Sequence, residues 1–253
     1  MNLPNIYTEE QWKRGGSIEA HKKHIGKPYL SWSAVELWRD EKAFGTKPEF
    51  SHLTGRMGYI TKYLFKDKSY IVDSMADFGQ FGHQTESCIC ERVDCEAFSK
   101  EELKVLHGIE PLGVFQREIL MPFKGFVLLG YIDDMTPPDE KGVVKLVRDY
   151  KTKSKSSKKD LHKPDKLQLD LYIAALEKEG LKVESAEYCI IERLGGRECM
   201  QGHGRSSLTV GKEVWYEPYA FSKKSMDRAK RLVREAASEI AEYYTVFQLL
   251  TKN

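Results

Sequence analysis

The chain has 253 residues, of which 41% are hydrophobic and 11% aromatic. That content is sufficient for a sizeable core in a single domain and excludes a disordered chain. Lysine and arginine together number 40, against 38 aspartates and glutamates, so the overall charge neither requires nor excludes nucleic acid as a partner. Because no long apolar run and no apolar signal region occur, we expect a cytoplasmic protein that makes no membrane contact.

The first 110 residues predict mainly helices, because apolar residues recur there at helical spacing. The expected helices cover residues 31–44, about 53–66 and about 74–95. A serine hydroxyl, that of Ser31 or Ser33, is placed to cap the first helix. Cys88, Cys90 and Cys95 fall within the last helix.

The next residues are rich in β-branched and aromatic side chains, and Gly or Pro separates the runs. They predict three successive strands in a meander, at residues 114–123, 125–135 and 142–152. A helix over 165–180, ended by Gly180, and a strand over 185–194 follow. Together these elements predict a β-β-β-α-β core within residues 111–195.

Two further elements follow this core. Residues 215–221 are expected to close a β-hairpin region, and residues 222–250 carry apolar side chains at helical spacing. The order of the elements does not alternate as it does in doubly wound folds. We therefore expect one mixed α/β (α+β) domain over residues 1–253, in which a helical N-terminal part and a C-terminal segment, 196–253, surround a central mixed sheet.

Asp149 and Lys151 lie two residues apart at the end of an apolar strand, so their side chains share a face of the sheet. Asp133 ends the preceding strand, and Asp134 should face the other way. If the two strands pair, Asp133, Asp149 and Lys151 converge at one edge. Carboxylates are ligands that Mg²⁺ and Mn²⁺ prefer, and a neighbouring ammonium group stabilises phosphate charge. The sequence therefore predicts metal-assisted phosphodiester hydrolysis.

An acidic residue two positions before a lysine is not specific by itself. The chain holds four such pairs, which is roughly the number expected by chance. Only Asp149–Lys151 follows an apolar strand, whereas Asp139–Lys141 lies in a Pro-rich turn. The simpler interpretation of Asp149 and Lys151 is a surface ion pair, and the presence of Asp133 favours a site instead.

Two helices add candidate residues. Gln168 and Tyr172 share a helix face, where they can orient a phosphate or a water, although ordinary helix packing is the alternative. On the helix over 74–95, His83 and Glu86 also share a face. A neutral His83 imidazole is a candidate metal ligand that favours Mn²⁺, and a hydrogen-bonded core histidine is the alternative.

Four motifs occur in order along the chain: His83, Gly130-Tyr-Ile-Asp133, Asp149-Tyr-Lys151 and Gln168-x-x-x-Tyr172. In this order they resemble the PD-(D/E)xK nuclease superfamily, and within it the RecB-type branch, which includes many phage nucleases. The resemblance covers about residues 31–195 and implies a restriction-endonuclease-like core. It also implies a DNA exonuclease of recombination, repair or DNA processing in the cytoplasm of a bacterium or a phage-infected host.

The resemblance implies how the metal would be held. Asp133 and Asp149 would bind Mg²⁺ or Mn²⁺ together with the backbone carbonyl of Tyr150. His83 would be a further metal ligand, and Glu86 would support the ligand residues without binding the metal itself.

Lys151 would be the catalytic lysine, while Gln168 and Tyr172 would support the active site and contact the nucleic-acid backbone. A lysine-rich stretch begins at Lys151. Such a run is usually a solvated loop, but beside a nuclease site it would also follow the phosphates, with binding that weakens with salt. The other lysines expected to contact nucleic acid are Lys153, Lys155, Lys158 and Lys159.

The five cysteines are an odd number in a chain expected in the cytoplasm, which disfavours a disulfide framework. Some RecB-type relatives carry a four-cysteine iron–sulfur cluster with three of its cysteines near the C-terminus. Here the group of three lies upstream, so we expect no cluster. Zinc is no better supported, because no Cys-x-x-Cys pair occurs, and we expect buried free thiols.

Two other functions remain open from the sequence. The same fold can serve as a nucleic-acid-binding or protein-interaction module without cleavage, although the complete set of Asp133, Asp149 and Lys151 argues against that. An iron–sulfur nuclease of the CRISPR-adaptation kind is the other. A homo-oligomer or a recombination partner protein is compatible with either enzyme. The tryptophans, expected in the core more than in base stacking, are Trp12, Trp32, Trp38 and Trp215.

Overall fold

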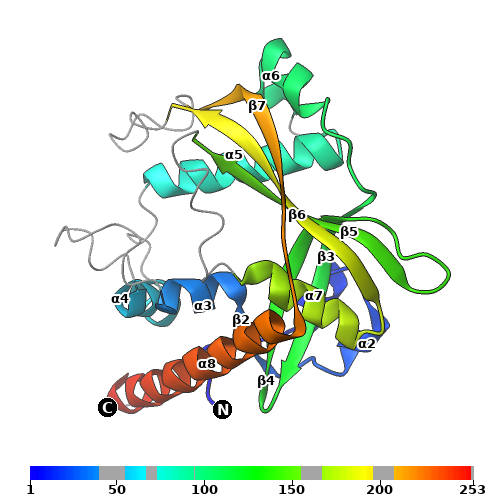
Figure 1. Ribbon diagram of the computed structural model, residues 1–253. Helices are drawn as coiled ribbons and strands as arrows, with labels where there is room; N and C mark the ends of the chain where they lie inside the picture. Colours follow the sequence, from blue (N-terminus) through cyan, green and yellow to red (C-terminus); the bar gives the residue numbers. More distant parts are fainter. Residues whose placement is uncertain (40–54, 67–72, 94, 155–166, 196–207, 252–253) are drawn as a thin grey trace.

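The computed structural model describes residues 1–39, 55–66, 73–93, 95–154, 167–195 and 208–251 (Figure 1). The strands are β1 (Asn5–Ile6), β2 (Pro28–Ser31), β3 (Val114–Phe123), β4 (Phe126–Met135), β5 (Val143–Lys153), β6 (Lys182–Leu194) and β7 (Thr209–Pro218). The helices are α1 (Glu9–Arg14), α2 (Glu19–Lys22), α3 (Trp32–Arg39), α4 (Gly55–Tyr59), α5 (Asp73–Cys90), α6 (Lys100–Leu106), α7 (Gln168–Lys178) and α8 (Lys223–Thr251). A π-helical turn (Ile60–Leu64) follows α4, and a 3₁₀ turn (Cys95–Ala97) follows α5.

These strands form one mixed sheet in the order β1-β2-β4-β5-β6-β7, with β3 paired to β4 outside that path. β3, β4 and β5 follow one another in antiparallel pairs, as a meander should. β5 and β6 are parallel because helix α7 crosses over between them. The mixed α/β class predicted from the order of elements is confirmed.

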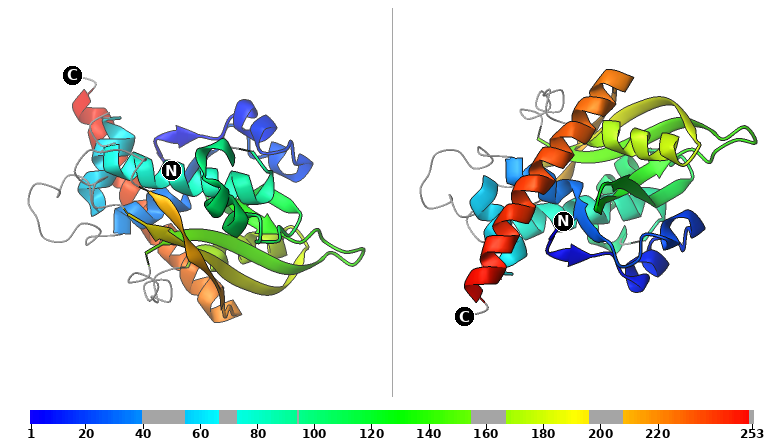
Figure 2. Two further views of the ribbon diagram at one scale, coloured as in Figure 1. Left: turned by 90° about the horizontal axis from the view of Figure 1, so that it is seen from above. Right: turned by 90° about the horizontal axis from the view of Figure 1, so that it is seen from below.

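Strand β6 shows why helices cover both faces of the sheet. Tyr188 and Ile190 pack in a hydrophobic cluster with residues of α7 and α8, whereas Cys189 and Ile191 pack in a second cluster with residues of α5 and α6. Successive strand residues point to opposite faces, so a strand that is apolar on both sides needs cover on both. Figure 2 shows α5 and α8 on opposite sides of these strands.

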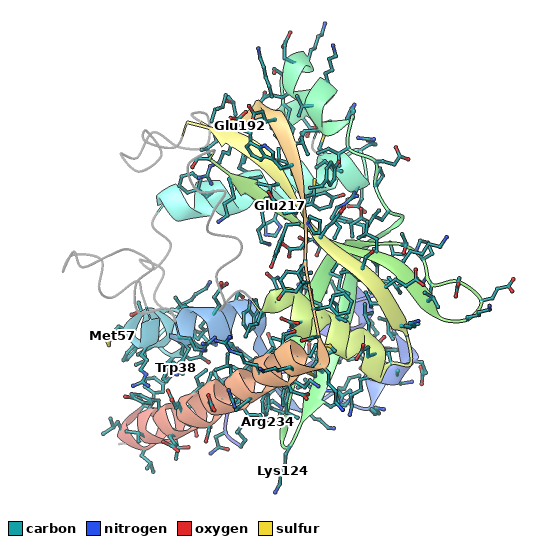
Figure 3. All side chains as sticks on the ribbon, viewed as in Figure 1. Trp38, Met57, Lys124, Glu192, Glu217 and Arg234 are labelled. Atoms are coloured by element: carbon teal, nitrogen blue, oxygen red, sulfur yellow. The ribbon has the colours of Figure 1, made fainter. Side chains whose placement is uncertain are left out.

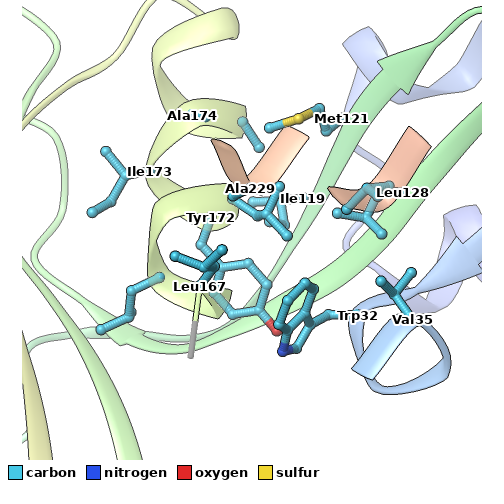
Figure 4. Close-up of a cluster of buried hydrophobic side chains, with 14 of the residues drawn as sticks. Trp32, Val35, Ile119, Met121, Leu128, Leu167, Tyr172, Ile173, Ala174 and Ala229 are labelled. Atoms are coloured by element: carbon cyan, nitrogen blue, oxygen red, sulfur yellow. The ribbon is translucent and has the colours of Figure 1, made fainter. Parts of the chain in front are cut away.

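Figure 4 shows part of the larger cluster, where α7 and α3 pack against β3 and β4. Its labelled side chains are Trp32, Val35, Ile119, Met121, Leu128, Leu167, Tyr172, Ile173, Ala174 and Ala229. Each fully buried large apolar side chain contributes roughly 1.5–3 kcal/mol. Tyr172 belongs to this cluster and also lines the cleft described below.

Trp38 joins α3 to the long C-terminal helix α8 (Figure 3). Its indole Nε1 donates a hydrogen bond of 2.8 Å to Oε2 of Glu239, and Arg56 of α4 pairs with the same carboxylate at 2.8 Å. Trp32 and Trp38 are both buried, so the expectation of core packing is confirmed for these two tryptophans. In the described part of the chain, α8 and the other helices are too polar or too short to cross a bilayer.

The N-terminal part departs from the helical prediction in two short strands. β1 pairs antiparallel with β2, and β2 adds parallel to β4. With two and four residues, these strands are too short to show a period. The strand that closes the predicted hairpin region begins earlier than residue 215, because β7 covers Thr209–Pro218 and pairs antiparallel with β6.

Two predicted helices have ends that the structure defines. Ser31 caps α3, since its Oγ accepts a hydrogen bond of 3.2 Å from the N–H of Ala34. The helix predicted over 74–95 stops at Cys90, because Arg92 adopts a left-handed φ of 58°. Cys95 therefore lies in the separate 3₁₀ turn and not on the helix that carries His83.

Candidate active site

Strand β4 has a stretch of edge without a neighbouring strand. β3 pairs along one side of β4 from Phe126 to Met135, with a break at Asp133. On the other side, β2 pairs as far as Leu129, and β5 pairs only from Asp134 onward. Within the described strands, residues 130–132 therefore pair with β3 alone, and Asp133 has no partner in the register of either neighbour. β2 and β5 diverge here, so groups from both faces of the sheet can reach one place.

Asp133 lies at the end of this open stretch. Its Oδ2 accepts a hydrogen bond of 2.9 Å from the backbone N–H of Tyr150 in β5. The N–H and C=O of one strand residue point to the same edge, so the Tyr150 carbonyl also faces the gap. Asp134 points to the opposite face, where its Oδ2 accepts a 2.9 Å hydrogen bond from the Tyr150 hydroxyl.

Asp149 and Lys151 share a face of β5 and form an ion pair. Asp149 is 1% exposed, and Lys151 is partly exposed. Burial raises the pKa of both Asp149 and Asp133 above the ordinary aspartate value, and the neighbouring Asp149 raises that of Asp133 further. Burial alone would lower the pKa of Lys151, but Asp149 and Asp133 raise it. Lys151 is therefore an ammonium ion at neutral pH.

Helix α7 brings Gln168 and Tyr172 to the same place. Nε2 of Gln168 donates a hydrogen bond of 2.7 Å to the Tyr172 hydroxyl. Burial raises the pKa of Tyr172, so its hydroxyl stays protonated and can itself donate into the cleft. Gly130 makes this approach feasible, because a Cβ there would lie 2.7 Å from Cε1 of Tyr172.

The predicted residues of α5 approach from the other face. His83 is exposed, with its Nδ1 3.8 Å from Oε2 of Glu86, and the neighbouring Glu86 carboxylate is the main cause that raises the pKa of His83. Glu86 is largely buried, and its charge raises the pKa of both Asp133 and Asp149. The structure thus places Glu86 in the electrostatic field of the carboxylates, while His83 extends into the cleft.

A cleft of about 500 Å³ connects these groups. The predicted site residues that line it are His83, Glu86, Asp133, Lys151, Gln168 and Tyr172. Its opposite wall comes from the N-terminal part, which the sequence did not connect with the site: Asn5, Gln11, Arg14, Tyr29, Ser31, Trp32, Ser33 and Glu36. Glu36 also raises the pKa of Asp149. Apart from the serine pair at the start of α3, Ser31 and Ser33, no motif marks these residues, because the fold alone brings β1, α1 and β2 to the edge of β4.

The lysine-rich stretch is described only at its start. Lys153 is half-buried at the end of β5. The other lysines expected to contact nucleic acid, Lys155, Lys158 and Lys159, lie outside the described residues.

The donors at the gap fit a hard divalent cation. Oδ1 of Asp149 is buried and has no hydrogen-bond partner among the described residues, although an unsatisfied carboxylate oxygen is costly. Oδ2 of Asp133 and the Tyr150 carbonyl face the same gap. Oxygen donors of this kind suit Mg²⁺ or Mn²⁺. His83 is less closely placed: among the described residues, the one set of three metal-ligating groups within 4.8 Å lies elsewhere.

The family model of the PD-(D/E)XK nuclease superfamily matches residues 63–248. The chain belongs to this superfamily. The enzyme is therefore a nuclease, and nucleases of this superfamily generally use divalent metals such as Mg²⁺ or Mn²⁺.

A solved structure from Eubacterium rectale, described as a "putative exonuclease", is similar with 14% identity and a TM-score of 0.45. The similarity covers 95% of this chain and 85% of the other. No curated protein matches the chain.

Proposed function

We propose that this PD-(D/E)XK nuclease hydrolyses DNA phosphodiester bonds with Mg²⁺ or Mn²⁺ at the gap between β4 and β5. The observation that carries the proposal is the convergence there of Asp133, Asp149 and Lys151. Asp133 and Asp149 are half-buried and buried carboxylates with raised pKa values. A bound cation would stabilise the ionised forms that burial disfavours. The Tyr150 carbonyl and His83 are the further proposed ligands, and Glu86 adds negative charge that strengthens cation binding.

The bound cation supplies Lewis-acid stabilisation of phosphate charge and lowers the pKa of water. Lys151 remains protonated, so it donates hydrogen bonds to the scissile phosphate or to the attacking water and does not act as a base. Tyr172, held by Gln168, donates a hydrogen bond from its hydroxyl to a phosphate oxygen and so positions the DNA strand. Lys153, Lys155, Lys158 and Lys159 follow the DNA backbone beyond the cleft.

The finer parts of the proposal rest on the family resemblance. We propose an exonuclease of phage-type or RecB-type recombination, repair or DNA processing, active in the cytoplasm and compatible with a homo-oligomer or a recombination partner protein. The structure favours neither alternative considered above. An inactive binding module has no need of Lys151 beside two carboxylates, and in the described part of the chain no four cysteines converge on an iron–sulfur site.

The test uses end-labelled linear DNA and closed circular DNA with Mg²⁺, Mn²⁺ or EDTA. Lys151→Met and Asp149→Asn should each lower the cleavage rate by roughly 10²-fold or more. Lys145→Met replaces an exposed lysine on the same strand and should retain the rate. Resistance of the circle identifies an exonuclease. A folded protein that cleaves neither DNA with either metal would favour the binding module.

A further inference from the structure

A second group of potential metal ligands lies away from the cleft. Sγ of Cys88, Sγ of Cys95 and a ring nitrogen of His107 all lie within 4.8 Å of one another. Three different elements supply them: the last turn of α5, the 3₁₀ turn and the residue that caps the C-terminus of α6. The chain therefore converges on this point from segments up to 19 residues apart.

The distances are those of a tetrahedral site. Nε2 of His107 lies 3.7 Å from Sγ of Cys88 and 3.6 Å from Sγ of Cys95. A tetrahedral zinc ion with ordinary Zn–S and Zn–N bonds separates sulfur from nitrogen by about 3.6 Å. The three groups thus need little movement to bind one ion.

The group is separate from the proposed catalytic site. Cys88 lies two residues after Glu86, so the two side chains point to opposite faces of α5. Cys88 packs in the second hydrophobic cluster, beside Phe81 and Phe98. Cys90 lies four residues after Glu86 on the same face of α5, and its sulfur does not belong to the group of ligand atoms that lie within 4.8 Å of one another. Cys90 is therefore not part of the group.

We propose that Cys88, Cys95 and His107 bind a zinc ion that fixes the C-terminal end of α5 to the 3₁₀ turn and to α6. Two thiolates and an imidazole are a donor set that selects zinc over Mg²⁺ or Mn²⁺. Cys88 and Cys95 lose their thiol protons to solvent when the ion binds. His107 is exposed, so water reaches the fourth position. The ion would hold α5, which carries His83 and Glu86, in place along the cleft.

The sequence expectation of free thiols rested on the absence of a Cys-x-x-Cys pair. The four described cysteines, Cys88, Cys90, Cys95 and Cys189, form no disulfide, so both thiols of the group can bind an ion. The spacing of these residues along the chain does not predict the group. Arg92 ends α5, so Cys95 lies back beside Cys88, and His107 comes from the end of the next helix.

The first experiment measures the zinc content of tag-free protein by inductively coupled plasma mass spectrometry. We expect one zinc ion per chain in the wild type, in Cys90→Ala and in the Asp133→Asn/Asp149→Asn double variant. In Cys95→Ala and in His107→Ala, the zinc content should fall tenfold or more. Equal zinc content in Cys90→Ala and Cys95→Ala would overturn the proposal, as would loss of the ion from the double variant alone.

The second experiment needs no substitution, so it remains decisive if a variant fails to fold. Protein stripped with a chelator and reloaded with Co²⁺ should show a near-ultraviolet sulfur-to-cobalt charge-transfer band, which a carboxylate site cannot produce. Zinc should protect Cys88 and Cys95, but not Cys90, from alkylation measured by peptide mass spectrometry. A folded wild-type protein with no such band and with equal alkylation of the three thiols would exclude the zinc site.

Discussion

The backbone N–H of Tyr150 donates a hydrogen bond of 2.9 Å to the side chain of Asp133. This contact links β4 to β5 just beyond the point where their ladder ends, since Asp134 pairs with Arg148 and Asp133 has no strand partner on that side among the described residues. A side chain thus takes the place of a backbone acceptor. The carboxylate is held at the gap by the strand that also carries Asp149 and Lys151.

The raised pKa of Asp133 predicts a conflict between stability and function. Burial and the charge of Asp149 disfavour the ionised form in the folded protein, so without metal Asp133→Asn should stabilise the fold by about 1 kcal/mol. Asn retains an oxygen that accepts from Tyr150. Thermal unfolding in EDTA should show Tm higher by roughly 2–4 °C, while the nuclease rate is lost.

Lys151→Met is the matched control for that experiment. It removes the cation that pairs with Asp149, so it should lower Tm in EDTA, because it leaves a buried carboxylate unpaired. A Tm for Asp133→Asn that is equal to or below the wild-type value in EDTA would show that the two carboxylates do not repel each other in the folded state.

Much of the site follows from the period of two along a strand. Because Asp149 and Lys151 are two residues apart, they had to share a face, and Asp133 ends the neighbouring strand. The gap between β2 and β5 could not be predicted, since it depends on where two strands stop pairing with β4. The cleft wall made by Arg14 and Glu36 depends on that same packing.

The errors at element ends also have physical reasons. β1 and β2 are too short for any pattern, and their pairing with β4 is a tertiary effect. The helical pattern of α5 continues past Cys90 in the sequence, but the left-handed conformation of Arg92 ends the helix there. No propensity identifies a left-handed arginine, because the cost of that conformation is offset by the surrounding packing.

Gly130→Ala tests the close approach of Tyr172 to β4. The new Cβ would lie 2.7 Å from Cε1 of the tyrosine ring and 3.4 Å from Cγ1 of Ile119, so the ring must shift. We expect a loss of about 1–3 kcal/mol in the free energy of unfolding, together with a large fall in kcat. Urea unfolding and steady-state kinetics measure the two effects.

A double variant separates this contact from other effects of the alanine. Tyr172→Leu removes the ring, so adding Gly130→Ala to it should cost much less than in the wild type. If the alanine costs the same with and without the ring, the strain arises elsewhere in β4.

The lysine-rich stretch predicts a specific salt dependence. Replacing Lys155, Lys158 and Lys159 with Gln removes up to three phosphate contacts, so the slope of log Kd against log salt should fall by roughly 2–3. Fluorescence anisotropy with Lys151→Met protein measures binding without cleavage. Replacing the exposed Lys145 with Gln is the control and should leave the slope unchanged. An unchanged slope in the triple variant would mean that the stretch does not follow the DNA backbone.

A buried network of hydrogen bonds and ion pairs beside β3 predicts how the stability of the fold depends on pH. His21 of α2 is 3% exposed on its side chain, and it bonds to Glu118 of β3 at 2.9 Å and to Glu179 after α7 at 3.0 Å. Tyr7 also donates to Glu118 at 2.7 Å. Arg117 pairs with Glu179 at 2.5 Å. These contacts attach the N-terminal wall of the cleft to the sheet.

Burial alone would lower the pKa of His21, but the two glutamates raise it above 6.5. Folded His21 therefore holds its proton more tightly than unfolded His21. Its contribution to the free energy of unfolding is complete below about pH 6.5 and is lost as the pH rises through the raised pKa. The pKa of Glu179 is lowered from 4.5, despite the opposing effect of burial. The contribution of Glu179 to the free energy of unfolding is complete above about pH 4.5 and is lost in more acidic solution.

The network should therefore be strongest between about pH 4.5 and pH 6.5. We expect His21→Gln to reduce the free energy of unfolding by about 1–3 kcal/mol in this window, with a difference that shrinks towards pH 9. His24 lies nearby, and burial with Lys27 lowers its pKa to about 4, so His24 becomes neutral at lower pH than His21. Urea unfolding of both proteins from pH 5 to pH 9 measures the difference, and a difference independent of pH would show that His21 is not charged in the folded protein.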